Sequence, residues 1–197
     1  MRPPARIALA AVLPAAVLAL SACTTPSPLP VLTPSATATP TPTPTTSTRS
    51  VTSIAGLALR AVGGTGTVTA VDDESFGTVW DVRVVEEDGS TQELHLGGAG
   101  RLLAGPSEVP TSADTMSANR AQVAAASISL ADAADRMRAA VPKGRVTAIE
   151  LTQYRDRVVW QGDVTNADGV RQDVRIDAVN GSVLLNLIDG QRSSGGS

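Results

Sequence analysis

The side chains that most often perform chemistry are scarce in this chain of 197 residues, which has one histidine and one cysteine. His95 stands between Leu94 and Leu96, so in an alternating strand it points to the polar face. A zinc site normally needs several histidine, cysteine or carboxylate ligands, and a Ser-His-Asp device would depend on His95 alone. We therefore expect no catalytic residue, no metal site and no cofactor, and we predict that the protein is not an enzyme.

Two acidic clusters are the next candidates for chemistry, and they occupy residues 72–74 and 86–88. Carboxylate oxygens are the ligands that Ca²⁺ prefers, but neither cluster has the ligand spacing of a calcium loop. We interpret both clusters as the solvated ends of hairpins.

Two tryptophans are candidates for binding. Trp80, Val82 and Val84 fall on one face of a predicted strand, which favours a place in the core. Tryptophan is also enriched in binding hot spots, so the alternative is a binding face formed by Trp80 and Trp160 as exposed anchors. Gly162 stands two residues after Trp160 and leaves room for a packed ring or for a ligand.

The cysteine, Cys23, closes the motif Leu20-Ser21-Ala22-Cys23 at the end of an apolar run of 14 residues, Ile7 to Leu20. A helix of that length spans about 21 Å, short of the roughly 30 Å core of a bilayer. Residues 1–22 are therefore predicted to be a signal peptide. The motif resembles a bacterial lipobox, which implies a diacylglyceryl (palmitate-type) anchor on Cys23 and an extracytoplasmic place at the cell membrane. The alternative is an ordinary secretory signal.

Residues 23–50 are rich in Thr, Pro, Ser and Ala. Such a composition buries too little apolar surface to offset the entropy of ordering. We predict a disordered tether there, extended by its Thr-Pro steps, and a disordered tail over residues 190–197.

The remainder of the chain carries an internal repeat. Val68-Thr69-Ala70-Val71 is echoed by Val146-Thr147-Ala148-Ile149, 78 residues later. Trp80 and Trp160 are 80 residues apart, as are the two Asp-Gly pairs at 88–89 and 168–169. The sequence therefore predicts two copies of one small domain, over 51–104 and 127–189. They are joined by a linker over 105–126, and we expect them to pack side by side.

Each copy is predicted to be a helix followed by antiparallel strands. In the second copy, Ser129 caps a helix from Leu130 to about Val141, and strands follow at 146–154, 157–165, 170–176 and 182–187. In the first copy, Thr52 or Ser53 caps a short helix, and strands follow at 67–71, 78–85 and 90–96. Residues 117–126 extend the second helix backward or form a helical turn of their own. The fold class is α+β, with a helix on a three- to four-stranded meander in each copy.

The second copy resembles a PepSY domain, a module of thermolysin-like propeptides and bacterial envelope proteins. The most telling part is the motif Asp177-x-x-Asn180-Gly181-x-Val183-Leu184. The first copy matches more weakly, because Gly97 stands where the second copy has Asp177. The resemblance implies an α+β fold and a non-catalytic role in binding or inhibiting peptidases, or in other extracytoplasmic interactions.

These features predict a membrane-anchored lipoprotein that acts as a binding or regulatory module at the cell envelope. Its partner would be an envelope protein or a peptidase. The competing interpretation is a structural spacer or assembly component without a regulated ligand. The net charge of −3 and the lack of a basic stripe argue against nucleic acid as a partner.

Overall fold

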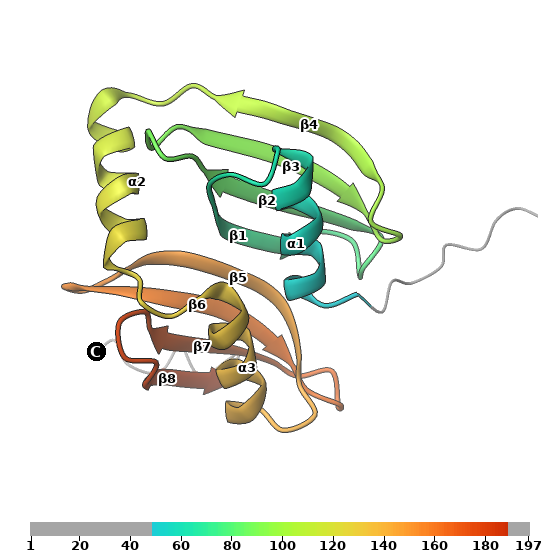
Figure 1. Ribbon diagram of the computed structural model, residues 1–197. Coiled ribbons are helices and arrows are strands. Elements are labelled where there is room, and N and C mark those ends of the chain that lie inside the picture. The colour runs from blue at the N-terminus through green and yellow to red at the C-terminus, as the bar shows by residue number, and fades with distance from the viewer. Residues whose placement is uncertain (1–48, 189–197) are drawn as a thin grey trace, which may run out of the picture. The chain divides into compact units, whose positions relative to one another are not determined.

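The computed structural model describes residues 49–188. The predicted signal peptide, the lipid attachment residue Cys23, nearly all of the predicted tether and the predicted C-terminal tail lie outside the described residues. Figure 1 shows the arrangement, and the elements run as follows: α1 (Val51–Ala61), β1 (Thr67–Asp73), β2 (Val79–Val85), β3 (Thr91–Gly97), β4 (Leu102–Val109), α2 (Ala113–Ala125), α3 (Leu130–Ala140), β5 (Arg145–Tyr154), β6 (Arg157–Thr165), β7 (Arg171–Asp177) and β8 (Val183–Ile188).

The eight strands form one antiparallel sheet in the order β4-β3-β2-β1-β5-β6-β7-β8. The α+β class with antiparallel strands is therefore confirmed. The expectation of two separate meanders packed side by side is replaced by a single sheet. The physical reason is that β1 and β5 would each be an unpaired edge in a separate meander, and pairing them satisfies both edges.

The β1–β5 pairing joins positions that the internal repeat equates. Val71 lies opposite Ile149, and these residues are 78 positions apart, the offset of the repeat. Ala70 lies opposite Glu150 and Asp72 opposite Ala148. Both strands also have a register shift at matching places, Val68/Ala70 against β2 and Val146/Ala148 against β6. The seam is therefore approximately two-fold symmetric, with its centre at Val71 and Ile149.

The helices α1 and α3 cover one face of the sheet, α1 over β1 and β2 and α3 over β5, β6 and β7 (Figure 1). The Ser129 hydroxyl accepts a hydrogen bond from the amide of Asp132 at 3.1 Å, which confirms the predicted cap of α3. The predicted cap of α1 at Thr52 or Ser53 is wrong. Ser50 is the N-cap, and its hydroxyl accepts from the amide of Ser53.

Both tryptophans lie in the core between the sheet and these helices, and Trp80 and Trp160 are 0% and 1% exposed. The room beside Trp160 is filled by Met137 of α3, because a Cβ on Gly162 would lie 2.6 Å from the Met137 sulfur. In the first copy, Ala58 stands at the position of Met137 and Val82 at the position of Gly162, and both are also buried. In the second copy a large helix residue, Met137, packs on a small strand residue, Gly162. In the first copy a small helix residue, Ala58, packs on a larger strand residue, Val82, as close packing requires.

Residues 105–126 were expected to be a linker, but the structure continues β4 to Val109 and forms α2 from Ala113. β4 lies at the far edge of the sheet, so the chain must cross three strands to reach α3, about 14–19 Å. A helix of 13 residues spans about 20 Å, which matches this crossing. α2 buries no residue completely; Val123 packs against the core, and polar contacts such as that from Asn119 Nδ2 to the Gly89 carbonyl at 3.0 Å also hold the helix.

We predict that Gly162→Val destabilises the protein by about 1–3 kcal/mol, because the added side chain overlaps the Met137 side chain and the Ala148 carbonyl oxygen. The double variant Gly162→Val/Met137→Ala has the residue types found at Val82 and Ala58, and it should recover the part of that loss that the overlap with Met137 causes, whereas the overlap with the Ala148 carbonyl stays. Urea denaturation of the three proteins measures the coupling free energy. Additive losses in the double variant would contradict the proposed exchange of volume.

Candidate functional site

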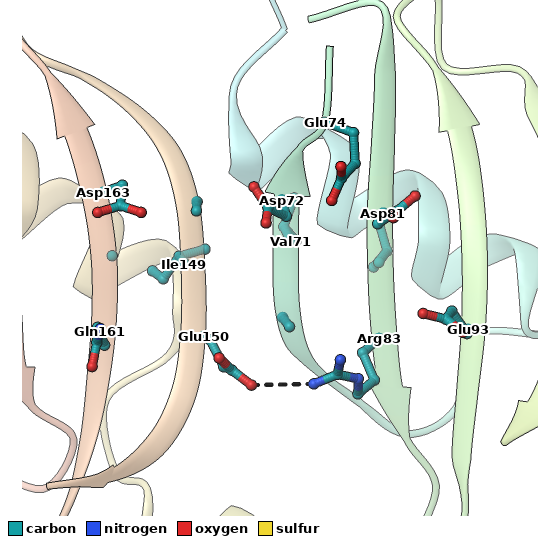
Figure 2. Close-up of a pocket in the computed structure, with 14 residues that line it drawn as sticks. Val71, Asp72, Glu74, Asp81, Arg83, Glu93, Ile149, Glu150, Gln161 and Asp163 are labelled. Atoms are coloured by element: carbon teal, nitrogen blue, oxygen red, sulfur yellow. Dashed lines mark hydrogen bonds and ion pairs between the residues drawn. The ribbon is translucent and has the colours of Figure 1, made fainter. Parts of the chain in front are cut away.

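A depression of about 250 Å³ lies on the helix-free face of the sheet, over the β1–β5 seam (Figure 2). Its floor is low because Ala70 and Ala148, at the centre of the seam, have small side chains. Long polar side chains from neighbouring strands form the walls. The carboxylates among them are Asp72, Glu74, Asp81, Glu93, Glu150 and Asp163, and the cation among them is Arg83.

The two ends of this depression differ in charge. At one end, Arg83 of β2 reaches over β1 and donates to the Glu150 carboxylate at 3.1 Å (Figure 2). The repeat equates Arg83 with Asp163 and Glu150 with Asp72. The matching end therefore holds two carboxylates, Asp72 and Asp163, where the first end holds an ion pair. Both pairs of positions are related by the approximate two-fold axis of the seam.

This juxtaposition changes the ionisation of Asp72. Partial burial raises the pKa of the Asp72 carboxyl, and the negative charge of Asp163 raises it further. Arg171, which pairs with Asp163, offsets part of this effect. The net shift is upward, so the folded protein holds Asp72 at a free-energy cost when it is ionised.

The structure places the two acidic clusters in different surroundings. Glu86-Glu87-Asp88 lies at the β2–β3 turn, where Asp88 accepts from the Ser90 amide at 2.8 Å, as a hairpin end does. Residues 72 and 73 are the last two of β1, and the Asp73 carboxylate accepts from the Gly77 amide in the β1–β2 turn, so they stand at a hairpin end, but Asp73 is not solvated as expected. The side chain of Asp73 is only 2% exposed, and its carboxylate pairs with Arg145 of β5 at 2.6 Å. Arg145 also stacks over the Trp80 ring, 5.5 Å from its centroid.

His95 lies on the helix-free face, as its strand alternation predicts, and its Nδ1 pairs with the carboxylate of Asp81 on the adjacent strand. In the part of the chain that the structure describes, no group of three or more His, Cys, Asp or Glu residues is placed to hold a metal ion. None of the helices within residues 49–188 combines the length and the apolar composition needed to cross a bilayer.

A second hollow, of about 440 Å³, lies on the other face between α1 and α3. It is mostly apolar, with Ala55 and Gly56 of α1 on one side, Ala131 of α3 on the other, and Trp160 and Leu151 at its floor. The indole N–H of Trp160 donates to the Ile128 carbonyl at 2.8 Å, so its polar atom is satisfied within the fold. Neither Trp80 nor Trp160 presents an exposed ring to solvent.

The motif that carries the resemblance builds a turn. The Asp177 carboxylate accepts from the amides of Val179 (2.9 Å) and Asn180 (3.1 Å) and pairs with Arg157 at 2.9 Å. These hydrogen bonds, of which that from Val179 has the largest effect, lower the pKa of the carboxyl below its usual value. Gly181 has φ +76°, and Arg136 of α3 packs against it and donates to its carbonyl at 3.0 Å. The motif is thus structural: it joins the β7–β8 turn to α3.

Residues 127–185 match the family model described as "Peptidase propeptide and YPEB domain", PepSY. This segment runs from the residues just before α3 into β8, and it contains the whole motif at Asp177–Leu184. Domains of this kind are generally non-catalytic binding or regulatory modules. The match confirms the predicted resemblance for the second half of the chain.

Among solved structures, the chain is similar to a protein assigned as a lipoprotein from Clostridium difficile 630. The two share 12% sequence identity with a TM-score of 0.44, over 70% of this chain and 91% of that one. This likeness is too distant to bear on function. No curated protein sequence matches this chain.

The sequence pattern favours a hairpin end over a calcium site at residues 72–74, and it does not connect Asp72 with Asp163. The repeat itself contained the signal, because it places Asp163 at the position of Arg83 and Asp72 at the position of Glu150. What the repeat alone does not show is that these positions meet across a seam.

We predict that Asp72→Asn raises the melting temperature at neutral pH. The pKa of the folded carboxyl is raised, so ionisation of Asp72 destabilises the fold above that pKa. The gain should shrink as the pH falls through the raised pKa, and it should vanish below the ordinary value, where Asp72 is neutral in both states. Thermal melts of wild type and variant across acid to neutral pH measure this. A variant less stable than wild type at pH 7 would contradict the assignment.

Proposed function

We propose that this chain is an extracytoplasmic lipoprotein, anchored through Cys23, that works as a non-catalytic binding module at the cell envelope. Its partner is an envelope protein, with a peptidase as the leading class. The partner places a lysine or arginine side chain in the carboxylate end of the depression over the β1–β5 seam. The PepSY match to residues 127–185 supports the non-catalytic binding class.

One observation carries the choice of surface. Asp72 and Asp163 both line the end of the depression that corresponds to the Glu150–Arg83 ion pair, and the charge of Asp163 raises the pKa of Asp72. Arg171 pairs with Asp163 at this end, and a guanidinium or ammonium from a partner would add a positive charge beside Asp72, as Arg83 does beside Glu150 at the other. A carboxylate whose pKa is raised inside a concave surface, as that of Asp72 is, is typical of binding sites.

We further propose that residues 51–104 are a second, diverged PepSY-like copy. The matched order of helix and four strands supports this, as do the equivalent register shifts in β1 and β5. In this interpretation the binding surface belongs to both copies, since Asp72 comes from the first and Asp163 from the second.

The binding proposal predicts opposite effects of one substitution. Asp72→Asn should weaken binding of a short arginine-rich peptide severalfold while it stabilises the fold. Asp168→Asn is the matched control, because it removes the same charge from an exposed hairpin outside the depression. Titrations of the full chain in detergent, followed by NMR and repeated at higher salt, measure the affinities.

The same three proteins are then used to capture envelope proteins. Partners retained by the wild type and by Asp168→Asn but lost by Asp72→Asn would support the proposal. Equal peptide binding and equal capture by all three would contradict it and favour the spacer interpretation.

The anchoring proposal predicts that Cys23→Ala releases the protein from the membrane fraction. The motif Leu20-Ser21-Ala22-Cys23 supports this expectation, because a lipobox cysteine carries the acyl anchor. Detergent partitioning and mass spectrometry of the N-terminal peptide measure it. A wild-type protein without lipid on Cys23, found only in the medium, would contradict this proposal.

A further inference from the structure

The eight-stranded sheet is open, so β4 and β8 are its edge strands. An edge strand presents backbone N–H and C=O groups that can pair with another strand, and proteins often protect such edges with proline, charge or bulges. The repeat makes β4 and β8 counterparts of each other, which allows a direct comparison of the two edges.

β4 has these protective features. Its pairing with β3 is interrupted by register shifts at Glu93/His95 and His95/Leu96. Pro106 lies within the strand after a cis peptide bond and has no N–H to donate, and Glu108 adds a charge. A regular ladder of added strand is therefore blocked along much of β4.

β8 lacks them. Its sequence, Val-Leu-Leu-Asn-Leu-Ile, contains no charged residue and no proline, and its pairing with β7 is regular from Leu185 to Ile188. Two of its apolar side chains are exposed, Val183 at 50% and Ile188 at 43%. The outer edge of β8 is thus a short, uncharged and apolar template for strand addition.

The strand is complementary to itself. Leu185 and Leu187 lie opposite Arg175 and Asp173 on the helix-free face, while Asn186 lies opposite the buried Val174 on the helix face. An antiparallel pair of two β8 strands centred on Asn186 sets Asn186 opposite its own copy and Leu185 opposite Leu187, within the segment Leu185–Ile188 that pairs regularly with β7. Every such pair lies on a single face of the sheet, as antiparallel pairing requires.

We propose that β8 pairs with β8 of a second copy, which forms a two-fold symmetric dimer with a continuous sheet. When β8 strands of two copies pair, no like charges lie opposite each other, because the strand is uncharged. The strand also has no charge with which a charged partner could form an ion pair. The chain already uses this geometry once, because β1 and β5 pair antiparallel about equivalent residues. The dimer leaves the depression over the β1–β5 seam uncovered, since that seam lies four strands from the β8 edge.

The first test uses side chains that are exposed in the monomer. Val183→Lys/Ile188→Lys places two like charges on the β8 edge, and Val170→Lys is the control, an apolar residue of similar exposure (37%) at a hairpin. Sedimentation equilibrium of the full chain in density-matched detergent gives the mass. We expect two chains for wild type and for Val170→Lys, and at least a tenfold weaker dimer for the double variant. A monomeric wild type, or a double variant that stays dimeric, would overturn the proposal.

The second test fixes the register. The full chain with Cys23→Ala has no cysteine, so Asn186→Cys adds one at the predicted two-fold axis. Opposed Cα atoms in an antiparallel pair lie about 4.5–5.5 Å apart, within the range of a disulfide. Mild oxidation should cross-link Asn186→Cys and leave Ser107→Cys on β4 as a monomer. Equal cross-linking at both edges would mean non-specific contact and would overturn the assignment.

Discussion

The pairing of β1 with β5 is the interaction on which the rest of this structure depends. It consists of three registered residue pairs, and it turns two four-stranded meanders into one sheet. Domains of some 50–60 residues bury little surface and are marginal alone. Pairing removes an exposed edge from each half and lets Arg145 of one half contact Asp73 and Trp80 of the other. The core then extends from α1 to α3 without interruption.

The approximate symmetry of the seam separates two kinds of divergence. In the core, Met137 over Gly162 stands where the other half has Ala58 and Val82, so the change in one residue is compensated by its neighbour. On the helix-free face, the Arg83–Glu150 pair corresponds to Asp163 and Asp72, and that exchange is not compensated within the seam. Packing density forces the first kind of compensation. On the helix-free face, solvent and Arg171 reduce the repulsion between Asp72 and Asp163, so the exchange of charges is tolerated. The negative charge of this surface is then available for binding.

The connection α2 introduces a further asymmetry. It crosses from β4 to α3 and rests on the β2–β3 turn, where a Cβ on Gly89 would lie 2.1 Å from the Met116 carbonyl oxygen. A Cβ on the matching glycine, Gly169, would have no neighbour within 4 Å. Only one of the two hairpins is therefore covered. The edges differ in the same way, because β4 carries a proline and a charge and β8 carries neither.

The sequence by itself determined the local elements and their order. Ser129 and Asp132 define the start of α3 because a cap is made within one turn, and alternation places Trp80, Val82 and Val84 in the core because it needs only the period of a strand. The PepSY motif was readable for the same reason, since the Asp177 turn is closed by bonds among neighbouring residues. The tertiary structure alone decided that the two halves share one sheet. Strand pairing between distant segments is set by which edges meet, and no local pattern records it. The apposition of Asp72 and Asp163 followed from that pairing, because the residues are separated by 91 positions and meet only across the β1–β5 seam.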